Sequence, residues 1–94
     1  SLINRTYCYP NPIMDGKGTI RVETVNAKKV RVLIYDLAGH FVNSFKTDLN
    51  QSGNQIAEWV WNTDKIESGV YFLHIDVSGD LDTETRIIKI AVIH

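Results

Sequence analysis

Apolar and polar residues alternate with a period of two along most of the chain. Ile20 and Val22 point to one side of residues 19–25, and Arg21 and Glu23 point to the other. This alternation is typical of a strand with one buried and one solvated face in an antiparallel sheet. We therefore predict seven strands, at residues 6–9, 19–25, 29–35, 40–47, 55–61, 70–77 and 83–93.

The segments between these strands carry turn signals and no helical pattern. Glycines lie among Asp, Asn and Ser residues, which bond their own backbone in turns. No segment keeps a 3.6-residue period over three turns, so we predict no substantial helix and at most one short turn at residues 62–68. Short strands with a turn about every 8–12 residues are typical of an immunoglobulin-like β-sandwich. We therefore predict an all-β fold of this type, with about seven antiparallel strands.

Three aromatic residues permit two interpretations each. Tyr71 begins the strand predicted at 70–77, where it is either a tyrosine corner or an ordinary core tyrosine. Trp59 and Trp61 share a face with Ala57. This favours a place in the core, because so small a sandwich needs bulky residues there. The alternative is a sugar-stacking pair.

Composition places the chain among ordinary globular domains. It has 94 residues, a formal net charge of −1 and a single cysteine, Cys8. A nucleic-acid module usually carries a basic excess, and a disulfide scaffold needs paired cysteines, so both classes are excluded. No apolar run is long enough for a membrane helix, and no signal segment opens the chain, so an export signal either lies upstream or is absent. We expect residues 1–94 to be one domain, taken from a larger secreted protein.

Candidate chemical groups are scattered along the sequence. Nothing brings Cys8 together with a histidine as a nucleophile and base, and a free cysteine is usually a small buried apolar residue. Asp80, Asp82 and Glu84 do not match the spacing of an EF-hand loop. They favour a solvated hairpin, with a weak calcium site as the alternative. We predict no catalytic residue, no metal site and no cofactor, and therefore a binding, sorting or structural module.

Four motifs in the right order resemble a known family. They are Y-P-N-P at residues 9–12, I-Y-D-x-x-G-x-x-V at 34–42, S-G-V-Y-F at 68–72, and a final T-x-x-x-K strand at 85–93. Together they resemble the C-terminal sorting domains of type IX (Por) secretion cargo. The W-N-T-D turn at residues 61–64 is similar to one in a related group, the immunoglobulin-like domain of the flagellar hook-cap protein.

The resemblance implies the same sandwich and a non-catalytic role. Such a domain carries its parent protein from the periplasm to the cell surface and anchors it there. The implied partners are an outer-membrane shuttle β-barrel, a sortase-like peptidase and the upstream domain of the parent, with no nucleic acid and no transmembrane segment. The family-signature residues are Pro10, Asn11, Pro12, Asp36, Gly39, Gly69 and Tyr71.

Several of these residues have a readable physical role. Pro10 and Pro12 lack a backbone N–H, so the first strand must end there. Asp36 can accept a hydrogen bond within its own turn, and Gly39 can adopt a positive φ in the hairpin. Gly69 is expected to allow a tight bend into the next strand.

The last predicted strand is apolar on both faces. Ile88, Ile90 and Val92 alternate with Ile87, Lys89, Ala91 and Ile93. We hypothesise that the strand is a sorting signal, with candidate residues Lys89, Ile90, Val92 and Ile93. A secretion component would recognise it partly by adding a strand to an exposed edge, and Lys89 would supply a charge for register or orientation. Two alternatives are packing against a parent domain and a structural or carbohydrate-binding accessory module of a secreted hydrolase.

Overall fold

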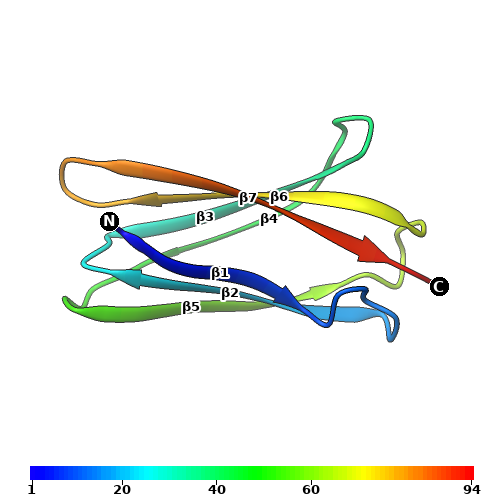
Figure 1. Ribbon diagram of the computed structural model, residues 1–94, viewed down its shortest axis with the longest axis horizontal. Coiled ribbons are helices and arrows are strands. Elements are labelled where there is room, and N and C mark those ends of the chain that lie inside the picture. Colours follow the sequence, from blue (N-terminus) through cyan, green and yellow to red (C-terminus); the bar gives the residue numbers. More distant parts are fainter.

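The computed structural model describes residues 1–94 as two packed β-sheets (Figure 1). One sheet has the order β1-β2-β5 and the other has the order β4-β3-β6-β7, with antiparallel neighbours throughout. The strands are β1 (Ile3–Tyr9), β2 (Lys17–Val25), β3 (Lys29–Asp36), β4 (Phe41–Asp48), β5 (Asn54–Asn62), β6 (Gly69–Ser78) and β7 (Thr83–Val92). The predicted all-β sandwich of seven strands is confirmed. The chain has no helix long and apolar enough to cross a membrane.

The fourth strand stays beside the third, which makes the second sheet four-stranded. In the constant-type immunoglobulin domain the fourth strand instead joins the opposite sheet. A tight hairpin holds β4 here, because the Asp36 carboxylate accepts a hydrogen bond from the His40 amide at 2.8 Å. Gly39 has a φ of +86°, which only glycine adopts at little cost. The expected roles of Asp36 and Gly39 are therefore confirmed.

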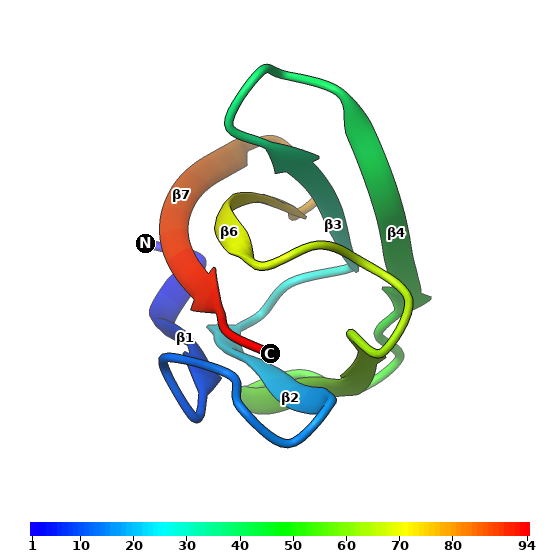
Figure 2. The same ribbon diagram turned by 90° about the vertical axis from the view of Figure 1, so that its right-hand side faces the viewer.

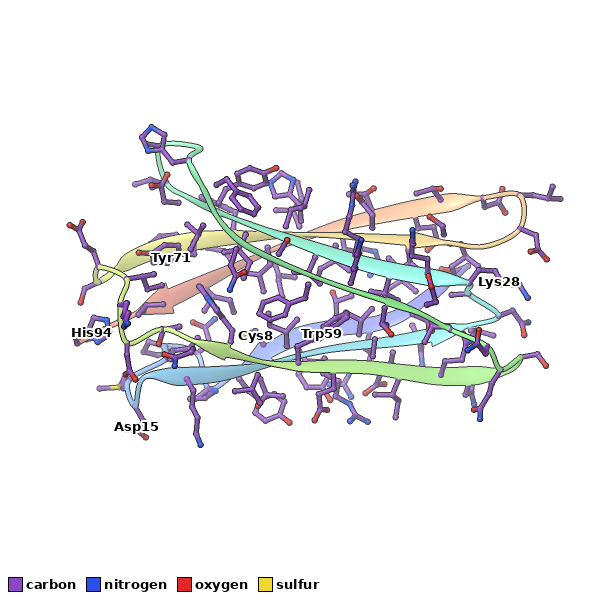
Figure 3. All side chains as sticks on the ribbon, turned by 180° about the vertical axis from the view of Figure 1, so that it is seen from behind. Cys8, Asp15, Lys28, Trp59, Tyr71 and His94 are labelled. Carbon is purple, nitrogen blue, oxygen red and sulfur yellow. The ribbon has the colours of Figure 1, made fainter.

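The inward-facing side chains form one core between the sheets. It is made largely of the alternate residues of the central strands, including Ile20, Val22, Val30, Val32, Ile34, Leu73, Ile75 and Val77. Trp61 is 1% exposed and packs edge-on against Tyr71, with ring centroids 5.7 Å apart. Trp59 is half-buried against Phe45 at 5.9 Å, and Figure 3 shows it between the two layers with Cys8. Both tryptophans thus pack in or against the core, as predicted.

The tyrosine corner is present. The Tyr71 hydroxyl donates a hydrogen bond to the Glu67 carbonyl oxygen at 2.6 Å, which fixes the chain as it enters β6. In the same connection, the amide of Ile66 bonds the carbonyl oxygen of Thr63, as expected for a single short turn. Gly69 differs from expectation. Its φ is not positive, and an added Cβ would meet only the Tyr71 ring at 4.0 Å, so no tight bend requires glycine there.

The first strand begins at Ile3 rather than at residue 6. A register shift between Ile3 and Arg5 breaks the alternation, so this part of the strand is hidden in the sequence pattern. Ile3 is buried in the core. The Glu84 carboxylate of β7 accepts hydrogen bonds from the amides of Leu2 and Ile3, which ties the beginning of the chain to the last strand.

Candidate functional site

Residues 10–13 lie along the outer edge of β7, and we call this segment the strap. The Asn11 side-chain amide donates to the Lys89 carbonyl oxygen at 3.3 Å, and its oxygen accepts from the Ala91 amide at 3.1 Å. Ile13 continues the pairing through its backbone. Its amide donates to the Ala91 carbonyl oxygen at 2.8 Å, and its carbonyl oxygen accepts from the Ile93 amide at 2.9 Å. Figure 2 shows this loop, which follows β1, beside the end of β7. The strap therefore acts as a short extra strand on β7.

The strap is fixed to the core by Ile13. This side chain is fully buried, and a Cβ added at Gly18 would lie 2.5 Å from its Cδ1 atom. Pro10 and Pro12 end β1 after Tyr9, as predicted, and bring no amide donor that would need a partner. Displacing the strap would cost both the pairing and the burial of Ile13.

The expectation of an exposed backbone edge is wrong over residues 89–93. Asn11 and Ile13 bond the Lys89 carbonyl oxygen, the amide and carbonyl oxygen of Ala91, and the Ile93 amide. The sequence pattern does not reveal this cover, because the partners lie about 80 positions away and one of them is a side chain. A partner strand has no free edge to join at this end of β7.

The four candidate signal residues divide between the core and the surface. Ile90 and Val92 are buried between the sheets. Lys89 is exposed on the outer face, and Ile93 is 44% exposed just after the strand. His94 follows, with its amide bonded to the Ser68 hydroxyl and its Nε2 atom 2.7 Å from the Ile66 carbonyl oxygen.

The family-signature residues gather at one end of the sandwich. Pro10, Asn11 and Pro12 belong to the strap, and Asp36 pairs directly with Tyr71 across β3 and β6. Figure 3 shows Tyr71 at the same end as His94 and Asp15, opposite Lys28. The structure thus brings the signature motifs to the end at which the strap covers β7.

Three carboxylates of the chain accept hydrogen bonds that hold strands and turns. A backbone hydrogen bond from Leu2 is the main cause that lowers the pKa of Glu84, and one from His40 lowers that of Asp36. Burial acts to raise the pKa of Asp76, yet hydrogen bonds from Arg31 and Thr85 outweigh it, and the pKa is lowered. Each of these shifts favours the charged carboxylate in the folded chain.

The possible nucleophile and metal ligands are not brought together. Burial raises the pKa of the Cys8 thiol to about 11, which disfavours the reactive thiolate. His40 lies in the β3–β4 turn, 3.3 Å from the Asp36 carboxylate, and His74 packs against Tyr35 on the other side of the four-stranded sheet from the core. No group of three or more His, Cys, Asp or Glu side chains is arranged to hold a metal ion.

Comparison with known proteins identifies one family for this chain and other proteins that share its fold. A family model described as a secretion system C-terminal sorting domain matches residues 7–90. Ulvan lyase NLR42 of Nonlabens ulvanivorans is 31% identical over 80 residues, which is 85% of this chain and 13% of the enzyme. The chain therefore spans only about one eighth of that relative.

Two solved structures share the fold at low identity. The β-glucuronidase of Parabacteroides merdae with glycerol in its active site matches with a TM-score of 0.65 and 16% identity, over 98% of this chain and 13% of that one. The C-terminal domain of wzt matches with a TM-score of 0.67 and 12% identity, over 98% of this chain and 72% of that one. These likenesses support the sandwich architecture alone.

The family match covers most of the elements described above. It begins within β1 at residue 7, includes the strap and the β3–β4 hairpin, and ends within β7 at residue 90. Domains of this family are non-catalytic in general and interact with the secretion machinery. The chain therefore belongs to the secretion system C-terminal sorting domains, which direct proteins through type IX secretion to the cell surface.

Proposed function

We propose that this domain sorts a longer parent protein by presenting its last strand to the type IX machinery. The candidate signal residues are Lys89, Ile90, Val92 and Ile93. The proposed partners are an outer-membrane shuttle β-barrel, which receives the domain, and a sortase-like peptidase, which separates it from the parent at the surface. The domain itself supplies no catalytic residue, cofactor or metal.

The division of the last strand between core and surface is the observation that supports this proposal. Ile90 and Val92 are buried and hold β7 in the sandwich. Lys89 projects from the opposite face and forms no salt bridge within the chain. The inner residues would therefore fix the geometry of the strand, and the outer ones would contact the receptor.

We also propose that residues 1–94 act as a single domain of a larger secreted protein. The chain corresponds to 13% of the length of the ulvan lyase that it resembles. The machinery would recognise the sorting domain and not the protein joined to it, so a reporter protein can replace the parent.

The test is the secretion of a reporter joined to a signal peptide and to residues 1–94. We expect delivery to the cell surface or medium in bacteria with a working type IX system, and periplasmic retention without one. Deletion of residues 89–94 should abolish delivery. Lys89→Glu should reduce it strongly, whereas Lys46→Glu, at an exposed lysine of β4, should not. Equal delivery with and without residues 89–94 would refute the proposed signal.

No observation favours the carbohydrate-binding alternative. Sugar stacking requires an exposed indole face, whereas Trp61 is buried and Trp59 packs against Phe45. We therefore propose no second function.

A further inference from the structure

The outer face of the four-stranded sheet has a polar half and an aromatic half. In the polar half, Arg31 donates to the Asp76 carboxylate at 2.9 Å, and the Thr85 hydroxyl donates to the same carboxylate at 2.8 Å. In the aromatic half, two rows of cross-strand neighbours run over β3, β6 and β7. We call these six residues the aromatic face: Leu33, His74 and Ile87 in one row, and Tyr35, Phe72 and Lys89 in the next.

The aromatic face has no cover. Figure 1 shows two layers only, with nothing packed on the outside of β3, β6 and β7. Tyr35 packs edge-on against His74, with ring centroids 5.0 Å apart, and both remain partly exposed. Ile87 is 57% exposed although it stands in the middle of a regular strand. A cluster of large apolar side chains on an open sheet face is typical of a protein interaction site.

The aromatic face is also a route by which a folded partner can reach this end of β7. The inward residues Ile90 and Val92 are buried, and the strap occupies the backbone edge. The outward side chains of Ile87 and Lys89 remain exposed, and they are continuous with Phe72 and His74 of β6.

On the basis of the proposed function, we infer that the aromatic face is the docking surface of the secretion receptor. The aromatic face would bind an apolar surface of the receptor that places a carboxylate against Lys89. Lys89 is the one permanent cation among the six residues and forms no salt bridge within the chain. A charge left unpaired within an apolar patch selects a partner of opposite charge.

Charge also argues against a membrane surface as the occupant. A membrane surface usually attracts several cations around an apolar patch, whereas Lys89 is the one permanent cation among the six residues and the chain has a net charge of −1.

The decisive variants lie outside residues 89–94, so that they test the face and not the terminal signal. Ile87→Thr replaces an exposed isoleucine of β7, and Ile56→Thr is its matched control on β5, at 54% exposure. We expect Ile87→Thr to lower reporter secretion about tenfold, as for a central interface residue, and Ile56→Thr to leave it unchanged. Phe72→Thr extends the test to β6, with thermal unfolding of each purified variant as the check that it folds.

The sign of the partner's charge is tested at the same position. Ile87→Glu should reduce secretion further than Ile87→Lys, because a new carboxylate would face the carboxylate of the partner. Ile56→Glu and Ile56→Lys should not differ. Equal secretion by the two Ile87 variants would overturn the charge assignment.

The remaining outcomes also decide the inference. If secretion needs residues 89–94 but tolerates folded Ile87→Thr and Phe72→Thr, the docking face is refuted while the proposed function stands. Binding of the wild-type domain to phosphatidylcholine–phosphatidylglycerol vesicles that Ile87→Thr abolishes would assign the face to lipid instead. A dimer in analytical ultracentrifugation that the same substitution dissociates would assign it to a second copy.

Discussion

At the scale of single residues, Asn11 takes the place of a peptide group. Its side-chain amide offers one donor and one acceptor, as a backbone unit does, and uses them on Lys89 and Ala91. An aspartate there would keep the acceptor and lose the donor. This gives the asparagine of the Y-P-N-P motif a physical reason that the motif alone does not state.

Asn11→Ala should reduce the stability of the domain without changing its fold. Loss of two partly exposed hydrogen bonds should lower the free energy of unfolding by about 1–2 kcal/mol. Urea unfolding measures the loss, and hydrogen exchange should show a less protected Ala91 amide. Asn4→Ala is the control, because the Asn4 side chain is exposed and forms no hydrogen bond. An unchanged urea midpoint and unchanged protection of Ala91 would refute the role of Asn11.

At the scale of elements, β7 is held on both sides. It pairs with β6 along its whole length, and on the other side the Glu84 carboxylate bonds the beginning of β1 while the strap covers the far end. Edge strands need such protection, since open edges pair with other chains. The last strand is therefore held near both ends of its outer edge, and we call these contacts of β1 and the strap with β7 the seam.

Glu84→Gln should make stability less dependent on pH in the acidic range. The pKa of Glu84 is lowered in the folded chain, chiefly by the hydrogen bond from the Leu2 amide. The stabilisation is therefore complete above the ordinary pKa of a glutamate, about 4.3, and is lost as pH falls through the lower folded value. Thermal unfolding of the wild-type and Glu84→Gln proteins from neutral to acidic pH measures this dependence of stability on pH. Parallel curves would show that Glu84 contributes nothing.

The elements differ in how far the sequence predicts them. The segments with clean alternation, such as Lys17–Val25 and Gly69–Ser78, were recognisable because period two survives along their length. The beginning of β1 was not, because its register shift interrupts that period. The strap was missed for a different reason. The sequence shows that residue 11 carries a side-chain amide, but only the fold shows that Ala91 lies beside it.

At the scale of the whole molecule, two sheets enclose one core and leave two dissimilar outer faces. On β2 and β5, Arg21 bonds Glu23 and Glu58, so polar groups satisfy one another on that side. On the other side the aromatic face has no such partners. The two outer faces thus differ in their polar pairing, although Ile56 and Val60 of β5 are also exposed.

Cys8 provides a measure of how tightly the two layers stay together. Its thiol is buried, and a pKa of about 11 leaves roughly one molecule in ten thousand as thiolate at pH 7. We expect a thiol reagent to label Cys8 only as fast as the domain unfolds, and to label it at once in concentrated urea. Rapid labelling of the folded protein would contradict the packing described and would reopen a reactive role for Cys8.

The seam between β1, the strap and β7 joins residues that are 78 to 83 positions apart in the chain. Neither closure can form on a ribosome until the last strand has been translated. A polypeptide interrupted before Glu84 lacks the partner of Leu2 and Ile3, and also lacks the strand on which Asn11 and Ile13 close. The folded sandwich thus requires a chain that has been translated through β7, so an exporter that recognises it would pass over products truncated before that strand.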